Sequence, residues 1–312
     1  MRIVLVDPSR TVHRIVTQLI EQGQHEVRPF TDGREALEYI KTDPDVRALI
    51  TSAEPISMPG ANLCAEARAL ANGHRPLYIL LMSSSDDQMI LVKALDNGAD
   101  DFIHKPPVAE ELRARLRAAD RVTLMQQELI QHATTDFLTG TLNRRAFFAH
   151  AKEVCAQAVA GKALSAIMID IDHFKQVNDV HGHQIGDVVL RGVAAELSAS
   201  GYIVGRLGGE EFCILVANSI LDAIGVAEDL RHIISKLLFD AESGALAVTC
   251  SCGVAEWEAE DTIDRLLRRA DMALYEAKHA GRNRVIASDS YSISKSHEEW
   301  RGVARSGRPR GN

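Results

Sequence analysis

A glycine pair followed by two glutamates separates two apolar runs in the second half of the chain. The runs are residues 202–207 and 212–216, and the intervening turn 208–211 reads Gly-Gly-Glu-Glu. Glycine adopts the positive φ angles that tight hairpin turns need. The pattern therefore predicts two adjacent antiparallel strands whose turn presents the carboxylates of Glu210 and Glu211. Solubility does not require acids at that point, but a site that holds a divalent cation over a polyphosphate does.

Two aspartates lie at the end of another apolar run, upstream of this hairpin. Asp170 and Asp172 are two residues apart in the predicted strand 163–172, so their side chains point to the same side. Burying both would be costly without a cation or hydrogen-bond donors. Together with the hairpin glutamates they predict an oxygen cage suited to Mg²⁺, which combines a few carboxylates with substrate phosphates. The alternative is that one or both cap the helix that starts near His173.

The second half of the chain, from Asp136 onward, predicts an α+β domain on a largely antiparallel sheet. Its hairpin pairs two strands directly, whereas helices separate the other strands. We expect further strands at 163–172, 247–257 and 284–286, and helices at 187–199, 219–238 and 261–279. The last residues, 288–312, are rich in Ser, Gly, Arg and Pro and predict a disordered tail.

The first half of the chain alternates short apolar runs with amphipathic segments. Five continuous apolar strands with helices between them indicate a parallel sheet covered on both faces, the α/β doubly wound class. Ligand sites in such sheets lie at the carboxyl ends of the strands. The expected strands are 3–6, 26–30, 48–51, 77–82 and 102–104, and the expected helices are 11–22, 33–41, 61–71 and 87–97.

A long helix without Gly or Pro is predicted from Val108 to Ala133. It carries two weak heptad seams, and it is either a terminal helix that runs on into a linker or a stalk that pairs two chains. We favour the stalk, because linkers without turn residues are stiff. One seam is Leu112, Leu116, Ala119, Thr123, Gln126, Ile130 and Ala133, and the other is Ala118, Val122, Met125, Leu129 and His132.

These patterns divide the chain into four parts. The first domain covers residues 1–122, and a helical stalk or linker at 108–135 overlaps its last helix. The second domain covers 136–287, and the tail covers 288–312.

Charge and cysteine usage limit the function classes. The net charge of the 312 residues is −8, which argues against a nucleic-acid partner held by bulk electrostatics. The five cysteines include no CxxC pair, which is typical of buried thiols in a reducing cytosol. The N-terminus does not have the pattern of a signal peptide, and no apolar run has the length of a membrane span. We therefore expect a cytoplasmic protein.

Four residues are suited to binding phosphate. Phe174 and Lys175 open a helical stretch, where free backbone N–H groups beside a lysine attract anions. Lys278 and Arg282 are four apart on the predicted last helix, hence on one face. The alternative for this pair is a role as solvated charges near a helix C-terminus.

Two more polar residues are suited to a base edge. Asn178 supplies an amide, and the carboxylate of Asp187 would accept the N1–H and N2–H₂ groups of guanine together. Each residue alone would be an ordinary surface or cap residue.

The second domain resembles the GGDEF family of diguanylate cyclases in an ordered set of motifs over about half of the chain. The matching segments are 135–140 with 143–145, 169–175, 178–179, 182–183, 186–187, the turn 208–212, 270–275, Lys278 and 281–283. A single GGEEF sequence would be weak support, whereas the ordered set is specific. The resemblance implies a fold similar to the palm of nucleotide polymerases. It also implies condensation of two GTP molecules into cyclic di-GMP with release of two pyrophosphates.

The resemblance implies roles for the matching residues. Asp170 and Glu210 would bind Mg²⁺ together with the backbone carbonyl of Ile171, and Glu211 would lie near the metal and the attacking 3′-hydroxyl. The substrate-binding set would be Phe174 and Lys175 on phosphates, Lys278 and Arg282 at the γ end, and Asn178 and Asp187 on guanine. Two Mg²⁺ ions per active site are implied, with Mn²⁺ as an alternative. Because each domain would hold one GTP, catalysis would need a homodimer.

The family's product-inhibition motif, RxxD, is missing. Its positions hold residues 199–202, Ala-Ser-Gly-Tyr, so neither the Arg nor the Asp is present. We therefore expect weak or no feedback inhibition through that site.

The first domain resembles a response-regulator receiver with a degenerate phosphorylation site. Asp7, Ser83 and Lys105 fit the ends of the first, fourth and fifth strands. Asp7 is followed by Pro8 instead of a second acid, and Ser52 lies where the resemblance implies a phosphorylated aspartate. We therefore expect neither Mg²⁺ binding nor aspartyl phosphorylation. The hypothesis is a domain that dimerises or takes its signal from a regulatory protein partner.

The sequence thus predicts a diguanylate cyclase, active as a dimer and controlled through a receiver-like domain. The first alternative is a non-catalytic signalling module that binds GTP or cyclic di-GMP. The second is a cyclase for another nucleotide.

Overall fold

The computed structural model describes the chain except for residues 22–24, 72–74, 85–87, 160, 242–243 and 289–312. The tail expected at 288–312 therefore lies outside the described residues from 289 on. The chain divides into two compact units, and the boundary falls within one helix: the first unit covers Met1–Gln131 and the second begins at His132.

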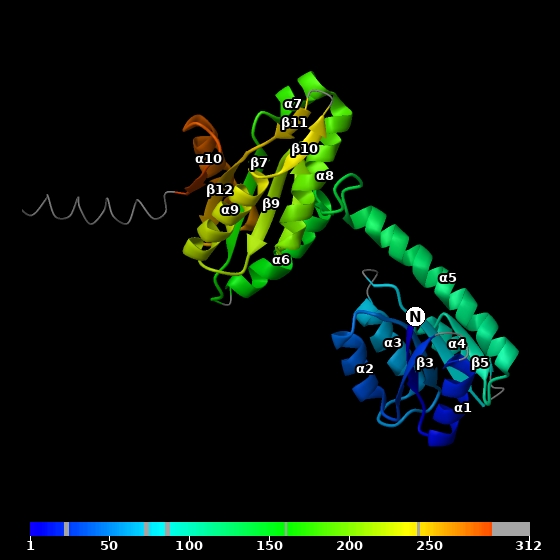
Figure 1. Ribbon diagram of the computed structural model, residues 1–312. Helices are drawn as coiled ribbons and strands as arrows, with labels where there is room; N and C mark the ends of the chain where they lie inside the picture. The colour runs from blue at the N-terminus through cyan, green and yellow to red at the C-terminus, as the bar shows by residue number, and fades with distance from the viewer. Residues whose placement is uncertain (22–24, 72–74, 85–87, 160, 242–243, 289–312) are drawn as a thin grey trace, which may run out of the picture. The chain divides into compact units, whose positions relative to one another are not determined.

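The first unit is a five-stranded parallel sheet in the order β2-β1-β3-β4-β5. Figure 1 shows helices on both sides of this sheet. One apolar cluster lies under α2, α3 and α4, and another lies under α1 and α5, so helices cover both faces. The predicted doubly wound fold is confirmed. The strands are β1 (Arg2–Val6), β2 (Glu26–Phe30), β3 (Val46–Ser52), β4 (Tyr78–Ser83) and β5 (Asp101–His104), and the helices are α1 (Arg10–Glu21), α2 (Gly33–Thr42), α3 (Gly60–Ala71), α4 (Gln88–Asp96) and α5 (Ala109–Thr134).

The long helix α5 uses one of its two seams inside its own unit. Leu112, Leu116, Ala119 and Thr123 are buried, and the first three pack against the sheet. These residues are therefore not available to pair with a second chain, which corrects half of the seam prediction. The other seam remains at the surface, where Val122, Met125 and Leu129 are exposed.

The second unit is built on a six-stranded sheet in the order β13-β12-β7-β9-β8-β6. Its three central pairings are antiparallel, and its two edge strands, β6 and β13, pair in parallel. The α+β prediction is therefore confirmed. The strands are β6 (Leu142–Asn143), β7 (Ser165–Ile171), β8 (Ile203–Gly208), β9 (Glu211–Val216), β12 (Cys250–Glu256) and β13 (Val285–Ala287), and the helices are α6 (Arg144–Val159), α7 (Phe174–His181), α8 (His183–Ala199), α9 (Ile220–Ile234) and α10 (Ile263–His279).

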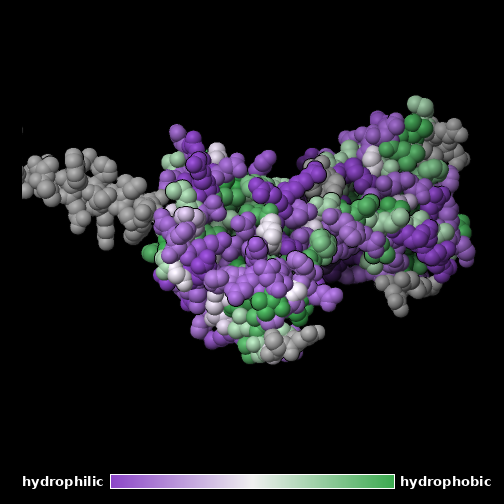
Figure 2. Space-filling view, turned by 90° about the horizontal axis from the view of Figure 1, so that it is seen from above, coloured by the Kyte–Doolittle hydropathy of each residue, from purple (hydrophilic) through white to green (hydrophobic). Residues whose placement is uncertain are grey.

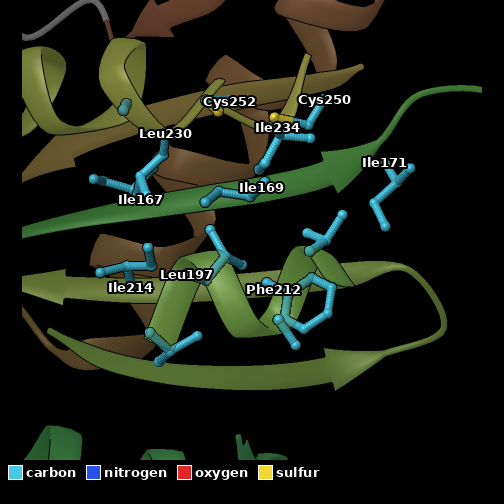
Figure 3. Close-up of a cluster of buried hydrophobic side chains, with 14 of the residues drawn as sticks. Ile167, Ile169, Ile171, Leu197, Phe212, Ile214, Leu230, Ile234, Cys250 and Cys252 are labelled. Atoms are coloured by element: carbon cyan, nitrogen blue, oxygen red, sulfur yellow. The ribbon is translucent and has the colours of Figure 1, made fainter. Parts of the chain in front are cut away.

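Two apolar clusters cover the faces of this sheet. Figure 3 shows the larger cluster, in which Ile167, Ile169 and Phe212 of the strands meet Leu197 of α8 and Leu230 of α9. The opposite face packs against α6 and α10. Most of the surface visible in Figure 2 is hydrophilic, with scattered apolar patches, as expected for a chain with 25% charged residues.

A glycine allows the close approach of α10 to the sheet. A Cβ atom on Gly253 of β12 would lie 2.1 Å from the carbonyl oxygen of Ala270 and 2.2 Å from the nitrogen of Leu274. Both contacts are with helix backbone, so a larger residue would force α10 outward. This close packing places the end of α10, which carries Lys278, over the end of β7.

The expected helix 219–238 and strand 247–257 differ from the structure. The helix α9 ends at Ile234, and a two-stranded hairpin, β10 (Leu238–Ala241) and β11 (Gly244–Ala247), follows before β12 begins at Cys250. The N–H of Ser235 still bonds the carbonyl of Arg231 four residues earlier, but the N–H groups of Lys236 and Leu237 bond carbonyls three residues earlier, so the α-helical pattern ends here.

Candidate active site

The centre of the candidate site is the end of β7. Asp170 is the last but one residue of this strand and is only 5% exposed. In the antiparallel pairing with β9, Asp170 lies directly opposite Glu211. Directly opposed residues of antiparallel strands point to the same side of the sheet. The strand aspartate and the second hairpin glutamate therefore share one face of the sheet.

The predicted hairpin joins β8 to β9, and its turn is open to solvent. Gly209 has φ +50, and the register between the two strands shifts between Arg206 and Gly208. A Cβ atom on either glycine of the turn would meet nothing within 4 Å. The room above the turn and the half-buried Glu210 make it a place where a ligand can approach the backbone closely.

A lysine from α10 neutralises the buried aspartate. Lys278 Nζ lies 2.7 Å from Asp170 Oδ2. Burial raises the pKa of Asp170 to about 6, the ion pair with Lys278 lowers it, and the charges of Glu210 and Glu211 raise it further. The buried Asp170 thus has one ammonium group in contact and two further carboxylates within electrostatic range, so the site favours additional positive charge.

These residues fit a divalent cation only if the ion draws ligands from elsewhere as well. In the parts of the chain that the structure describes, no group of three or more His, Cys, Asp or Glu side chains is placed to enclose a metal. Mg²⁺ needs no such cage, because it commonly takes one or two carboxylates and completes its shell with water and phosphate oxygens. The buried carboxylate with a raised pKa, flanked by two more acids, meets that requirement.

Asp172 does not belong to this carboxylate group. It accepts hydrogen bonds from Thr249 Oγ1 and Ser251 Oγ, both at 2.7 Å, and from the backbone N–H of Asn283 at 3.0 Å. The alternative role as a helix cap is also wrong, because α7 has His173 at its N-cap position and no side chain caps it. Asp172 instead holds the end of β7 to β12 and to the segment after α10.

The residues predicted to bind phosphate lie at two helix ends. Phe174 begins α7 and its ring is buried, so only its backbone N–H is available, whereas Lys175 is exposed. Arg282 is not on the helix of Lys278, which corrects the prediction. The helix α10 ends at His279, and Arg282 follows Gly281 with a positive φ of +61. The exposed Arg282 is held by a bond from its N–H to the carbonyl of Ala277.

The two residues predicted to recognise guanine lie on packed helices. Asn178 is on α7 and Asp187 is on α8, and both are half-buried. A Cβ atom on Gly186 would lie 1.9 Å from Asn178 Oδ1. The glycine next to Asp187 therefore leaves the space that the Asn178 amide occupies, which brings the two polar groups into one region.

The receiver site holds one acid, one base and hydroxyl groups. Asp7 is fully buried in an ion pair with Lys105, and Lys105 Nζ also donates to Ser52 Oγ at 2.8 Å. Ser83 is buried nearby at the end of β4. Glu54 is exposed and contributes only its backbone N–H, which bonds Ser52 Oγ.

Sequence reasoning missed two residues that support the hairpin turn. Arg206 of β8 contacts the turn and also Asp136, with 2.9 Å between Nη1 and Oδ1. The sequence places Asp136 in the matching segment 135–140 and at the start of the second domain, but it indicates no role for Asp136 at the turn. The available signal was an arginine two residues before the first glycine of the turn, because an inward-facing charge there needs a partner.

Comparisons with known proteins identify a related family for each unit. The family described as "Diguanylate cyclase, GGDEF domain" matches residues 133–284, and the response regulator receiver domain family matches residues 3–117. Response regulator PleD of Caulobacter vibrioides is 34% identical over 301 residues, covering 91% of this chain and 65% of PleD. Diguanylate cyclase DgcM of Escherichia coli is 41% identical over 168 residues, covering 52% of this chain and 40% of DgcM. The chain thus spans less than two thirds of the length of these curated relatives.

A solved structure gives the same result for the second unit. The coiled coil and GGDEF domain of DgcB from Caulobacter crescentus, in complex with c-di-GMP, has a TM-score of 0.52 at 33% identity. The match covers 57% of this chain and 99% of that chain.

The chain joins a receiver domain to a GGDEF domain. The chain belongs to the GGDEF family, in the class whose members carry an N-terminal response-regulator receiver domain. Both predicted resemblances are confirmed. None of the helices in the described segments is long and apolar enough to cross a membrane.

Proposed function

We propose that this protein is a diguanylate cyclase that condenses two GTP molecules into cyclic di-GMP and two pyrophosphates. The observation that carries the proposal is the convergence of Asp170, Glu210 and Glu211 beside Lys278 at the end of β7. A non-catalytic relative would have no need to maintain three mutually repelling carboxylates around a buried position. Bound divalent ions, which we propose to be two Mg²⁺ or Mn²⁺, would neutralise the triphosphate and activate the ribose hydroxyl.

The other residues of the site bind and orient GTP in this proposal. Lys175 and the N-terminal N–H groups of α7 bind phosphate oxygens. Lys278 and Arg282 approach the γ-phosphate, and Arg282 does so from the turn after α10 rather than from the helix itself. The Asn178 amide and the Asp187 carboxylate bind the guanine edge.

The reaction requires two such domains, because each site holds one of the two GTP molecules. The exposed seam of α5, with Val122, Met125 and Leu129, supplies an apolar stripe through which two chains can associate. We therefore propose an active homodimer whose geometry controls the rate.

The receiver domain regulates this dimer without aspartyl phosphorylation. Lys105 already pairs with Asp7 and bonds Ser52, so the one buried acid is neutralised by a half-buried lysine. A phosphorylatable site would need further carboxylates to hold Mg²⁺. Its input is therefore dimerisation or contact with a regulatory protein.

Product inhibition through the family's usual motif is weak or absent. The first of its four positions, Ala199, is the last residue of α8, and Ala199, Ser200 and Tyr202 line a cavity of about 280 Å³. The carboxylates of Glu196 and Asp229 line the same cavity, so its charge disfavours an anionic dinucleotide.

One assay tests the proposed activity. Purified protein is incubated with Mg²⁺ and either GTP or ATP over a range of protein concentrations, and the products are separated by chromatography. We expect cyclic di-GMP from GTP only, with specific activity that rises with protein concentration, and no product from a Glu211→Gln control. GTP or cyclic di-GMP binding without product at any concentration would instead support a non-catalytic module.

A further inference from the structure

An arginine of β8 holds the turn that carries the candidate metal ligand. Arg206 Nε and Nη2 donate to the carbonyl oxygen of Gly209 at 2.8 and 2.7 Å. Its Nη1 donates to Asp136 Oδ1 at 2.9 Å, and its side chain is only 13% exposed. One planar guanidinium group therefore bridges the turn and a carboxylate 70 residues earlier in the chain.

The carbonyl that Arg206 holds belongs to the peptide bond between Gly209 and Glu210. Because the peptide unit is planar, fixing this oxygen also fixes the direction of the Glu210 N–H. Gly209 has no side chain to restrict it, and its Cβ position is open space. Arg206 thus restricts the peptide unit that leads into Glu210, whose charge acts on Asp170.

Asp136 is itself rigidly placed. Its Oδ1 accepts from the N–H of Thr139 at 3.0 Å and from Thr139 Oγ1 at 2.7 Å, and its own N–H donates to the carbonyl of Thr141 at 2.8 Å. Burial opposes ionisation, but the bonds from Thr139 and Arg206 prevail and hold the pKa of Asp136 below its usual value. The carboxylate therefore stays charged and keeps its bond to Arg206 at neutral pH.

Hydrogen bonds also join the strand next to β8 to the end of α5. Asn143 Nδ2 donates to the carbonyl oxygens of Ala133, in the last turn of α5, at 2.9 Å and of Thr135 at 3.4 Å. Asn143 lies in β6 directly opposite Arg206 in β8. The last turn of α5, the short strand β6 and the arginine that holds the turn are therefore joined by consecutive contacts.

We propose that Arg206 is a positioning residue for Glu210, and that Asp136 and Asn143 make its position depend on the end of α5. A change in the last turn of α5 would move Asn143 and Asp136, alter the guanidinium contact and so displace a metal ligand. The inference rests on the proposed function, because Glu210 is a metal ligand only in that proposal.

The test uses full-length protein with Arg206→Lys, Arg206→Ala and Asp136→Asn. The matched control is Arg269→Lys, because Arg269 likewise bonds a carboxylate, Asp261, and a backbone carbonyl, that of Glu256, in the same unit. Mn²⁺ binding in the presence of GTP is measured by electron paramagnetic resonance, and cyclic di-GMP formation is measured against Mg²⁺ concentration. Thermal unfolding is recorded for each variant.

The metal midpoint is the metal concentration that gives half-maximal binding or activity. Arg206→Lys and Arg206→Ala are expected to raise it about tenfold to hundredfold, the usual effect of losing a contact outside the ligands themselves. Asp136→Asn is expected to raise it less. Combining Asp136→Asn with Arg206→Ala should add nothing to the effect of Arg206→Ala alone, since both act through one contact. Guanidinium ions at about 20 mM should partly restore Arg206→Ala but not Arg206→Lys.

The control separates positioning from loss of stability. Arg269→Lys is expected to leave the metal midpoint unchanged. An unchanged midpoint in both Arg206 variants would overturn the inference while leaving the proposed function intact. If the wild-type protein made no cyclic di-GMP, the proposed function would fail, and Mn²⁺ binding would still decide the role of Arg206. If Arg206→Ala did not fold, Arg206→Lys would decide it.

Discussion

Replacing Asp170 by asparagine should make the metal-free protein more stable while abolishing its activity. In the folded protein the pKa of Asp170 is raised from 3.8 to about 6. Burial is the main cause, and it outweighs the ion pair with Lys278, which lowers the pKa. The folded state therefore binds the proton more tightly than the unfolded state. The contribution of Asp170 to the free energy of unfolding therefore falls as the pH rises from about 4 to 6, and it stays low at higher pH.

The size of the effect follows from the shift. At about 1.4 kcal/mol per pKa unit, a change from 3.8 to about 6 corresponds to at most about 3 kcal/mol at pH 7.5. At pH 4.5 the same shift corresponds to only about 1 kcal/mol. Asparagine does not ionise, so the Asp170→Asn protein should escape this loss, and its advantage should grow with pH.

Urea unfolding with EDTA at pH 4.5 and 7.5 would measure the difference. The two tryptophans are Trp257 and Trp300, and none lies in the first 131 residues, so fluorescence reports the second unit. A Trp300→Phe background restricts the signal to Trp257, which packs against the second apolar cluster of that unit. An Asp170→Asn protein that is no more stable at pH 7.5, or whose advantage does not grow with pH, would refute the reasoning.

The neighbouring aspartate is the matched control. Asp172 accepts three hydrogen bonds, so Asp172→Asn should destabilise the protein by about 1–3 kcal/mol. Added Mg²⁺ and GTP should stabilise the wild-type protein through binding but should not stabilise Asp170→Asn.

Three further changes have expected outcomes. Gly186→Ala places a Cβ atom against Asn178 Oδ1, and we expect the KM for GTP to rise about tenfold in a cyclase assay while kcat falls less. Lys105→Met leaves the fully buried Asp7 without its ion pair and should lower the free energy of unfolding of the first unit by about 3–5 kcal/mol. Urea unfolding followed by circular dichroism measures this loss, and adding Asp7→Asn should recover most of it. Leu129→Glu on the exposed seam of α5 should raise the protein concentration for half-maximal specific activity about tenfold, and an unchanged concentration dependence would exclude this seam as the dimer contact.

Local patterns predicted the elements whose signals lie within a few residues of one another. The glycine pair and its flanking runs were sufficient for the β8–β9 hairpin, and the alternating runs were sufficient for the five-stranded sheet. The hairpin of β10 and β11 was missed because residues 235–237, where α9 gives way to tighter turns, contain no glycine or proline to mark the end of the helix.

Arg282 shows how spacing alone misleads. Four residues after Lys278, it fits a helix face, but Gly281 adopts a φ of +113 and the helix is already over. The glycine was the available signal, because glycine commonly follows the last turn of a helix. Gly281 therefore predicts that the helix ends before Arg282 and that Arg282 lies in a turn.

The two aspartates of β7 show what sequence cannot provide. Period-two spacing makes Asp170 and Asp172 equivalent, and both do lie near the same end of the strand. The groups that donate hydrogen bonds or pair with them come from segments about 80 to 110 residues away, and those donors separate their roles. Asp172 meets three donors that satisfy a carboxylate without any cation. Asp170 meets one ammonium group and two more carboxylates, an arrangement that is satisfied only by further positive charge. The metal assignment therefore depends on which donors the fold brings to each acid, and only the folded chain decides that.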